Sequence, residues 1–255
     1  MTSVGIVVPA YKPNTRELVA YLRLIQKTIS PDRLHVELDD GSKETVRSIR
    51  ETGSTVEAVD GRRGKGTAIT TGFDKLNTDI LAFVDADGAT QIESLQEIIS
   101  TISNDSYDLA IGSRRHPDAN ILSHQTVVRR FLGDGFVYLT NRLLNLNLYD
   151  YQCGAKAISS EGWNKVRKEL YRPGFGWDVE LISMANESGL EIKEIPVKWE
   201  DKPGSTVPTF LTSQRLLYTL IVVYHRIKVL KHSTLHRRIS KIGTTPTPIV
   251  DRSWE

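Results

Sequence analysis

The sequence predicts an α/β protein with a mostly parallel central sheet, helices on both faces, and a C-terminal amphipathic helix. The first observation is that short β-branched runs alternate with segments whose apolar residues recur at helical spacing. The second is that a strand followed by a helix recurs three times in the first 112 residues, as in a parallel sheet with crossover helices. The third is that glycine or aspartate clusters end several of the predicted strands.

The first half of the chain alternates regularly between the two kinds of element. Its strands end at recognisable breaks, such as Pro9 and the Asp40-Gly41-Ser42 turn. The expected strands are Val4–Val8, His35–Asp39, Thr55–Val59, Ile80–Val84 and Leu109–Gly112, and the expected helices are Thr15–Ile29, Lys65–Leu76 and Gln91–Ile102.

The second half is less regular. We expect helices at Val127–Leu146, where Gly133 and Gly135 interrupt the pattern, and also at Gly176–Gly189 and Phe210–Leu230, with strands at Ala155–Ile158 and Ile192–Trp199. The simplest division of the chain is a main domain at 1–208, an amphipathic basic helix at 209–240, and a flexible tail at 241–255 that lacks periodicity.

Composition narrows the class of protein. The 255 residues carry a net charge of +2, so no global field marks a nucleic-acid binder, although residues 225–241 form a local basic stretch. The single cysteine, Cys153, excludes an intrachain disulfide and fits a reducing compartment. The apolar run Leu216–Tyr224 is too short to span a bilayer but could lie on one.

Ligands of parallel α/β sheets bind outside the carboxyl ends of the strands. Four clusters of polar or glycine residues follow predicted strands there: Pro9-Ala10-Tyr11, Asp39-Asp40-Gly41-Ser42, Asp85-Ala86-Asp87-Gly88 and Gly112-Ser113-Arg114. The sharpest is Asp85-Ala86-Asp87, which follows a buried strand. Two carboxylates at such a turn can bind Mg²⁺ or Mn²⁺ together with a diphosphate. A lone Asp-x-Asp is more often a solvated turn, but the other clusters at the same edge favour a site.

Each further candidate has an ordinary structural alternative. Asp40 could accept from a nucleobase or ribose, or simply form an Asp-Gly turn. The Gly-rich loop with Lys65 before a helix suits an anion, or is a basic surface turn. Arg114 and Arg129 could grip phosphates, or be solvated. Asp178 could belong to a pocket, or cap a helix.

The motifs resemble inverting family-2 glycosyltransferases of the GT-A fold, whose sheet is Rossmann-like. The resemblance runs from about Val4 to Thr206 and rests on Val7-Val8-Pro9-Ala10-Tyr11, Asp39-Asp40-Gly41-Ser42, Gly64-Lys65-Gly66, Asp85-Ala86-Asp87-Gly88 and Gly112-Ser113-Arg114. The run from Asp150 to Lys156 and the motifs Trp177-Asp178-Val179-Glu180 and Pro203-Gly204-Ser205 resemble dolichyl-phosphate glucose synthases and, more distantly, dolichyl-phosphate mannose synthases.

The resemblance implies a nucleotide-sugar donor, with UDP-glucose expected, and a polyprenyl or dolichyl phosphate acceptor. It implies that the base contacts Asp40 and the backbone near Pro9 and Tyr11, and that Lys65, Asp85, Ala86 and Asp87 line the diphosphate. Asp85 and Asp87 would hold Mg²⁺ or Mn²⁺. Arg114, Arg129 and Ser205 would meet the acceptor phosphate, and Asp87, Asp178, Arg114 and Arg129 form the implied catalytic set.

Some features depart from the family. Lys12-Pro13 replaces the usual Asn-Glu, and Thr206 stands where a lysine is common. The eukaryotic relatives carry an N-terminal membrane anchor, which we do not expect here. The helix Phe210–Leu230 could replace it as a peripheral element on the cytoplasmic face of a membrane, or pack against the domain or a second copy in a homo-oligomer.

Two alternatives to the lipid-phosphate reading remain. In one, the acceptor is a hydroxyl of a glycan or lipid, and Asp178 is the general base. In the other, the chain is a silent nucleotide-sugar-binding module, which the intact Asp85 and Asp87 pair disfavours.

Overall fold

A seven-stranded sheet organises the chain. The computed structural model describes residues 2–104, 107–121, 127–200, 209–233, 236 and 246–252, with the side chains of these apart from 127–132 and 209–213. The strand order is β3-β2-β1-β4-β7-β5-β8, and only β7 runs antiparallel to its neighbours. The strands are β1 (Val4–Tyr11), β2 (Arg33–Asp39), β3 (Thr55–Val59), β4 (Ile80–Val84), β5 (Leu109–Ser113), β7 (Ala155–Ser159) and β8 (Ile192–Pro196). The predicted mostly parallel α/β fold is therefore confirmed.

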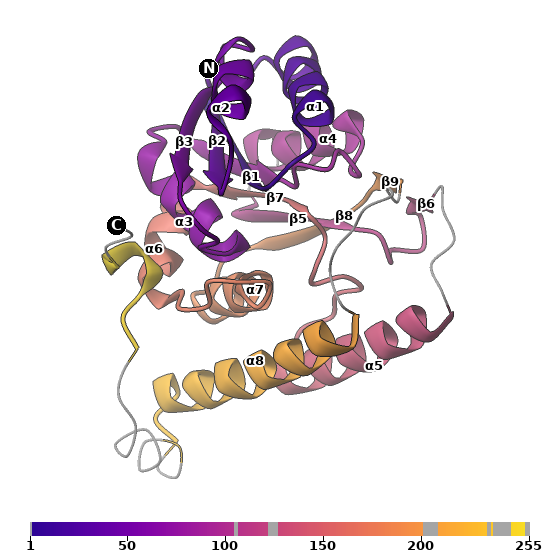
Figure 1. Ribbon diagram of the computed structural model, residues 1–255. Helices are drawn as coiled ribbons and strands as arrows, with labels where there is room; N and C mark the ends of the chain where they lie inside the picture. The colour runs from indigo at the N-terminus through magenta and orange to yellow at the C-terminus, as the bar shows by residue number, and fades with distance from the viewer. Residues whose placement is uncertain are drawn as a thin grey trace.

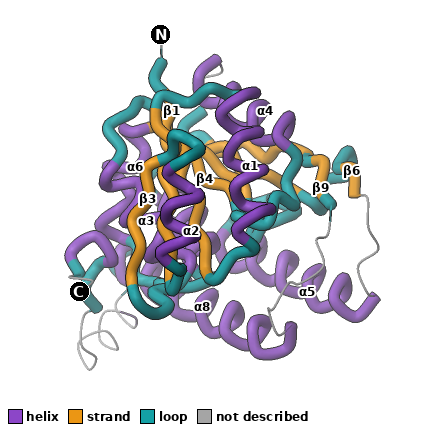
Figure 2. Tube along the Cα trace, turned by 45° about the horizontal axis from the view of Figure 1, so that its top comes forward, coloured by secondary structure: helices purple, strands orange, loops and turns teal. Residues whose placement is uncertain are grey.

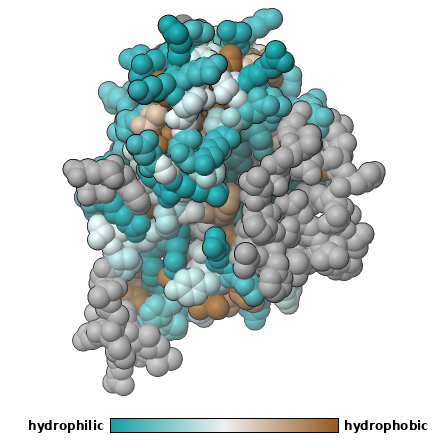
Figure 3. Space-filling view, viewed as in Figure 1, coloured by the Kyte–Doolittle hydropathy of each residue, from teal (hydrophilic) through white to brown (hydrophobic). Residues whose placement is uncertain are grey.

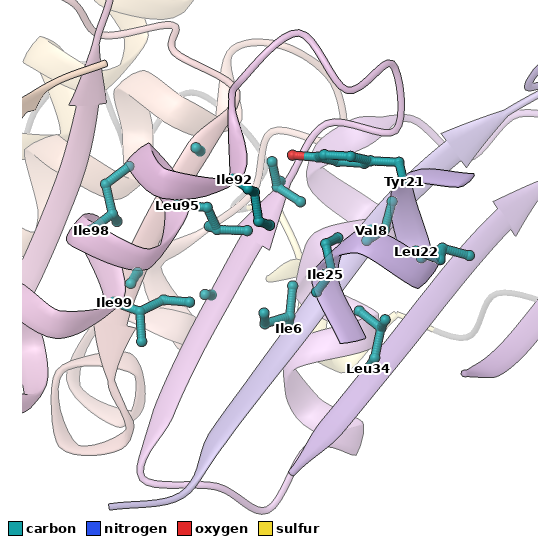
Figure 4. Packing of buried hydrophobic residues seen from close by; sticks show 14 of the residues in the cluster. Ile6, Val8, Tyr21, Leu22, Ile25, Leu34, Ile92, Leu95, Ile98 and Ile99 are labelled. Atoms are coloured by element: carbon teal, nitrogen blue, oxygen red, sulfur yellow. The ribbon is translucent and has the colours of Figure 1, made fainter. Parts of the chain in front are cut away.

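One face of the sheet is covered by α1 (Thr15–Thr28), α2 (Lys43–Arg50) and α4 (Ile92–Asn104) (Figures 1 and 2). Side-chain caps start two of these helices, because Asn14 accepts from the N–H groups of Arg16 and Glu17, and Ser42 accepts from that of Thr45. Apolar residues of α1 and α4 interdigitate with those of β1, as Figure 4 shows for Leu22, Leu95 and Ile6. Ala86, in the turn Asp85-Ala86-Asp87 (the DxD turn), packs against this layer.

The other face is covered by α3 (Lys65–Lys75), α6 (Ser160–Val166), the 3₁₀ turn η1 (Arg167–Glu169) and α7 (Trp177–Glu187). Trp177 packs edge-to-face on Phe73 and Phe83 at its centre, and these two rings are tilted to each other, with ring centroids 5.6–6.5 Å apart. The buried Trp177 indole also donates to Thr70 Oγ1 at 2.9 Å, so this residue packs the core. Aromatic packing thus fixes the start of α7 against α3.

Two long helices form a further layer beneath α7 (Figure 1). They are α5 (Val127–Leu144) and α8 (Thr209–Leu230), which pack on each other, and α8 also packs on α7. Gly133 and Gly135 do not break α5. Leu220, Val223 and Ile227 of α8 are buried, so this helix does pack against the domain. Within the described residues, no helix is both long and apolar enough to cross a bilayer.

Several details differ from the sequence prediction. The short helices α2 and α6 were not expected. The single strand expected at Ile192–Trp199 divides into β8, which pairs with β5, and β9 (Lys198–Trp199), which pairs with β6 (Asn120–Ile121). Within the tail expected to be irregular and flexible, residues 246–252 include the turn η2 (Ile249–Asp251), and Ile249 is buried, with its N–H donating to Leu170 O at 2.8 Å.

Candidate active site

The carboxyl ends of β1, β2, β4 and β5 lie along one edge of the sheet, as the sequence predicts. Because β7 is antiparallel, it starts at this edge, and the segment before it joins the same rim. Gly154 O accepts from Asp85 N at 2.8 Å. Strand topology therefore brings the Asp150–Gly154 segment beside the DxD turn.

The two aspartates of the DxD turn differ in their surroundings. Asp87 is exposed and accepts from Ala89 N through Oδ1 at 2.9 Å. Gly88 has φ +67°, which glycine adopts without strain, and its Cα faces the Tyr21 ring. Partial desolvation and the neighbouring Asp85 carboxylate raise the pKa of Asp87. Two carboxylates therefore lie close together at this turn.

Asp85 begins a chain of alternating charges that runs into the core. Lys65 Nζ lies 2.9 Å from Asp85 Oδ1 and 3.6 Å from Asp178 Oδ2. Lys156 Nζ donates to Asp178 Oδ1 at 2.5 Å and to Cys153 O at 2.8 Å. Although burial disfavours the charge of Lys65, the carboxylates of Asp178 and Asp85 raise its pKa. Lys65 is therefore a protonated counterion of both carboxylates, and Lys156 is a second buried partner of Asp178.

Gly154 holds Asp85 in place from the other side. A Cβ added at Gly154 would lie 2.0 Å from Asp85 Oδ2. Only glycine therefore permits this approach, which leaves one oxygen of Asp85 against the backbone and the other against Lys65.

The end of β2 shapes the loop before α3. Asp39 is buried and accepts from the N–H groups of Arg63 at 2.8 Å and Gly64 at 3.2 Å, and from Arg63 Nε at 2.8 Å. The Arg63 guanidinium also donates to Glu37, which is fully buried and has an ion pair with Lys75 as well. These bonds fix the loop that delivers Lys65 to the rim.

Tyr11 and Asp40 are exposed at the ends of β1 and β2. Asp40 has φ +56° and pairs with Lys12 at 2.8 Å. The Tyr11 ring is 40% exposed, and the Arg62 guanidinium lies 4.5 Å from its centroid. Pro9 lies in β1, two residues before Tyr11. An exposed aromatic face beside a carboxylate is suited to a nucleobase.

Arg114 is already bound to protein. Its Nε and Nη2 donate to the two carboxylate oxygens of Asp150 at 2.8 and 3.1 Å, and its backbone N–H also donates to Asp150. Although burial opposes ionisation, Arg114 and the Gln152 N–H hold the pKa of Asp150 below its usual value. Burial also raises the pKa of the neighbouring Cys153 to about 11, so its thiol is neutral at physiological pH.

The loop 171–174 covers the start of α3. Thr67 N donates to Pro173 O at 3.1 Å, and Glu180 accepts from Tyr171 N and Arg172 N at 2.7 and 2.8 Å. Glu180 also pairs with Arg226 of α8. Burial raises the pKa of Glu180 in spite of these partners. The sequence singled out Glu180 beside Asp178, but nothing local indicated that it orders this loop.

The structure brings together Lys65, Asp85, Ala86, Asp87, Asp178 and Arg114 with Pro9, Tyr11 and Asp40 along one rim. Asp178 does not cap its helix, because Gly176 holds the N-cap position and makes no side-chain cap. Arg129 lies in α5 with its side chain outside the described part, and Ser205 lies outside it altogether. Reasoning from sequence did not predict the roles of Gly154 and Lys156, although both lie in its Asp150–Lys156 motif.

A sheet of this order with paired aspartates at its rim has the architecture of a GT-A glycosyltransferase. A family model described as Glycosyl transferase family 2 matches residues 6–166, more than half of the chain. The chain therefore belongs to glycosyltransferase family 2, and it has the GT-A fold of an enzyme domain that transfers sugars.

Several characterised glycosyltransferases are similar to this chain in sequence. The chain is 32% identical over 148 residues to glycosyltransferase AglD of Haloferax volcanii, which covers 58% of this chain and 23% of that protein. It is 31% identical over 172 residues to the dolichyl-phosphate beta-glucosyltransferase of Saccharomyces cerevisiae (63% of this chain, 52% of the yeast protein). The Drosophila melanogaster enzyme of the same name is 27% identical over 248 residues, with 88% and 75% covered.

Solved structures share the fold. Glucosyl-3-phosphoglycerate synthase from Mycobacterium tuberculosis in complex with phosphoglyceric acid has a TM-score of 0.65 at 18% identity, covering 87% of this chain and 80% of that one. The same enzyme with Mn²⁺, UDP-glucose and phosphoglyceric acid has a TM-score of 0.64 at 16% identity, covering 88% and 80%.

Proposed function

We propose that this protein transfers glucose from UDP-glucose to a polyprenyl or dolichyl phosphate, with inversion at the anomeric carbon and with Mg²⁺ or Mn²⁺ as cofactor. The named activity of the dolichyl-phosphate beta-glucosyltransferases supports the sugar and the acceptor. The UDP-glucose and Mn²⁺ bound by the mycobacterial synthase support the donor and the metal. The local geometry supports three parts of this proposal.

The rim carboxylates fit a divalent cation. Asp87 is exposed, and its pKa is raised by partial desolvation and by the nearby Asp85 carboxylate, so these two residues would hold a divalent cation and it would offset their repulsion. Within the described residues, no group of three or more His, Cys, Asp or Glu side chains gathers as a metal site. The remaining ligands would come from the diphosphate and water, as Mg²⁺ often requires. When bound, the metal neutralises charge on the departing UDP.

The single observation that carries the choice of acceptor is the burial of Asp178. This side chain is 1% exposed, receives the Lys156 ammonium at 2.5 Å, and has Lys65 Nζ 3.6 Å from its second oxygen. A carboxylate enclosed by two ammonium groups cannot reach an acceptor hydroxyl in this conformation. A phosphate acceptor is already anionic and needs no base, so positioning and charge neutralisation supply the rate.

The nucleotide lies at the ends of β1 and β2 in this proposal. Asp40 and the exposed Tyr11 ring receive the base, and the backbone from Pro9 to Tyr11 lines the same pocket. Lys65 and the DxD turn receive the diphosphate. In this proposal the acceptor phosphate binds to the guanidinium N–H groups of Arg114 that do not contact Asp150, together with Arg129 and Ser205.

The outward face of α8 supports a peripheral position on the cytoplasmic side of a membrane. Leu217, Tyr218 and Ile221 are 43, 61 and 56% exposed, and apolar atoms gather over this helix at the lower edge of Figure 3. A surface helix with large exposed apolar side chains, followed by a basic segment, is suited to the lipid interface. A lipid-linked acceptor would be presented at this side.

The experiment is a screen of nucleotide sugars with a short polyprenyl phosphate and either Mg²⁺ or Mn²⁺, reading free nucleotide diphosphate. We expect UDP release from UDP-glucose that requires both metal and lipid phosphate. Release that occurs equally with polyprenol or a glycan hydroxyl would support the hydroxyl-acceptor alternative. No release from any donor would support a silent binding module.

A further inference from the structure

We propose that Lys65 is an internal cation that occupies Asp85 until a diphosphate arrives, so that metal and nucleotide bind as a coupled pair. The inference rests on the proposed metal site at Asp85 and Asp87 and adds that metal binding there is coupled to diphosphate binding through Lys65. It assigns Lys65 a role as a gate for the cation, beyond contact with the donor.

The contacts of Asp85 leave little room for a second cation. Its Oδ1 has Lys65 Nζ at 2.9 Å, and its Oδ2 lies against the Cα of Gly154, where a Cβ would be 2.0 Å away. Asp87, by contrast, is exposed and hydrogen-bonded through one oxygen only to the backbone of Ala89. A metal arriving at the turn therefore meets one available carboxylate and one that a lysine holds.

Four charged groups behind Asp87 balance one another. Asp85 and Asp178 alternate with Lys65 and Lys156, and the two lysine side chains are 12% and 1% exposed. A divalent cation added to this chain faces the Lys65 ammonium across a short, poorly solvated distance, which is strongly unfavourable. A diphosphate brings negative charge that offsets the metal and gives Lys65 a new partner.

The Lys65 ammonium can move from the two carboxylates to a phosphate without leaving Asp178 unpaired. Asp178 has its short contact, 2.5 Å, with Lys156, whereas Lys65 stands 3.6 Å away. Asp178 therefore stays neutralised when the Lys65 ammonium turns toward a phosphate. The loop that carries Lys65 is held by Asp39 through the Arg63 and Gly64 N–H groups, so only the side chain needs to move.

The test is Mn²⁺ binding by electron paramagnetic resonance, with and without UDP, for the full chain and for Lys65→Gln and Lys65→Arg. Lys168→Gln is the matched control, because it removes one charge from an exposed lysine of η1 outside this chain of charges. Thermal unfolding of each variant verifies that it is folded.

We expect wild type and Lys168→Gln to bind Mn²⁺ weakly alone and roughly tenfold or more tightly with UDP. Lys65→Gln should bind Mn²⁺ alone roughly tenfold more tightly than wild type and gain less from UDP, and Lys65→Arg should resemble wild type. Unchanged Mn²⁺ affinity in Lys65→Gln, with UDP coupling intact, would overturn the gate but leave the metal site standing. No Mn²⁺ binding by any variant, even with UDP, would overturn the proposed metal site and the gate together.

Discussion

Arg114 and Asp150 form a two-point ion pair that joins the end of β5 to the segment before β7, with Nε and Nη2 each donating to one carboxylate oxygen. Asp150 is 2% exposed and also accepts from the backbone of Gln152 at 2.8 Å. The pair therefore sets the path of the Asp150–Gly154 segment, which in turn lies against Asp85. Arg114, which the sequence suggested for phosphate binding, therefore also has a structural role at this edge of the sheet.

Replacing Asp150 with Asn should destabilise the fold, because it leaves the Arg114 guanidinium without its buried counterion. We expect a loss of about 3 kcal/mol in the free energy of unfolding, measured by urea titration at pH 7. Asp134→Asn, which removes the exposed partner of Arg115, is the control and should cost less than about 1 kcal/mol. Equal costs for the two variants would contradict the structural role of the Arg114 pair.

Asp150→Asn should also alter the pH dependence of stability. The folded pKa of Asp150 lies below its ordinary value of about 3.9, so its contribution is present above that pH and is lost as pH falls through the folded pKa. The stability difference between wild type and Asp150→Asn should therefore be largest near pH 7 and shrink below about pH 4. Urea titrations from pH 7 to pH 3 measure it, and a constant difference would exclude this source.

Gly154→Ala should impair activity while leaving the protein folded. The new Cβ would lie 2.0 Å from Asp85 Oδ2, so the partly exposed carboxylate must turn away from the position that it shares with Lys65. We expect turnover to fall roughly a hundredfold or more, as for a displaced charge-stabilising group. Gly135→Ala is the control, because nothing lies within 4 Å of its Cβ. Full activity in Gly154→Ala would show that the position of Asp85 is not critical.

Asp178→Asn distinguishes the two acceptor classes. In the phosphate reading Asp178 is a buried counterion of Lys156 and Lys65, so its loss should lower stability while turnover of the folded enzyme falls less than about tenfold. If Asp178 were a general base, its replacement would instead lower turnover roughly a hundredfold or more and remove the acidic limb of the pH–rate profile. Turnover at saturating substrates, normalised to the folded fraction, decides between them.

The sequence revealed the strands and the rim because both depend on local patterns. Val4–Val8 and Ile80–Val84 are apolar runs with clear breaks, and the DxD turn follows one of them directly. No local sequence pattern predicts the direction of β7, because its antiparallel pairing with β4 and β5 is decided by tertiary packing. The division of Ile192–Trp199 follows from Pro196 on the edge strand β8, after which Lys198 and Trp199 pair with β6.

The partners within the site were less predictable than its members. Asp85, Asp178 and Lys65 were all candidates, but the sequence could not show that Lys65 lies between the two carboxylates, because these contacts join distant segments. Lys156 pairs with Asp178 across 22 positions, and this buried pair favours the proposed counterion role over the base role of the hydroxyl-acceptor alternative. Motifs identify residue types, whereas charge balance becomes visible only in three dimensions.

The most direct test of the proposed activity is the lipid product formed from ¹³C-labelled UDP-glucose and a short polyprenyl phosphate, identified by mass and by the anomeric configuration in NMR. We predict a β-linked glucosyl phosphate of the polyprenol that requires Mg²⁺ or Mn²⁺ and is lost in Asp87→Asn, which should remain folded because Asp87 is exposed. A product whose glucose is attached to a hydroxyl, or one made equally well by Asp87→Asn, would contradict the account.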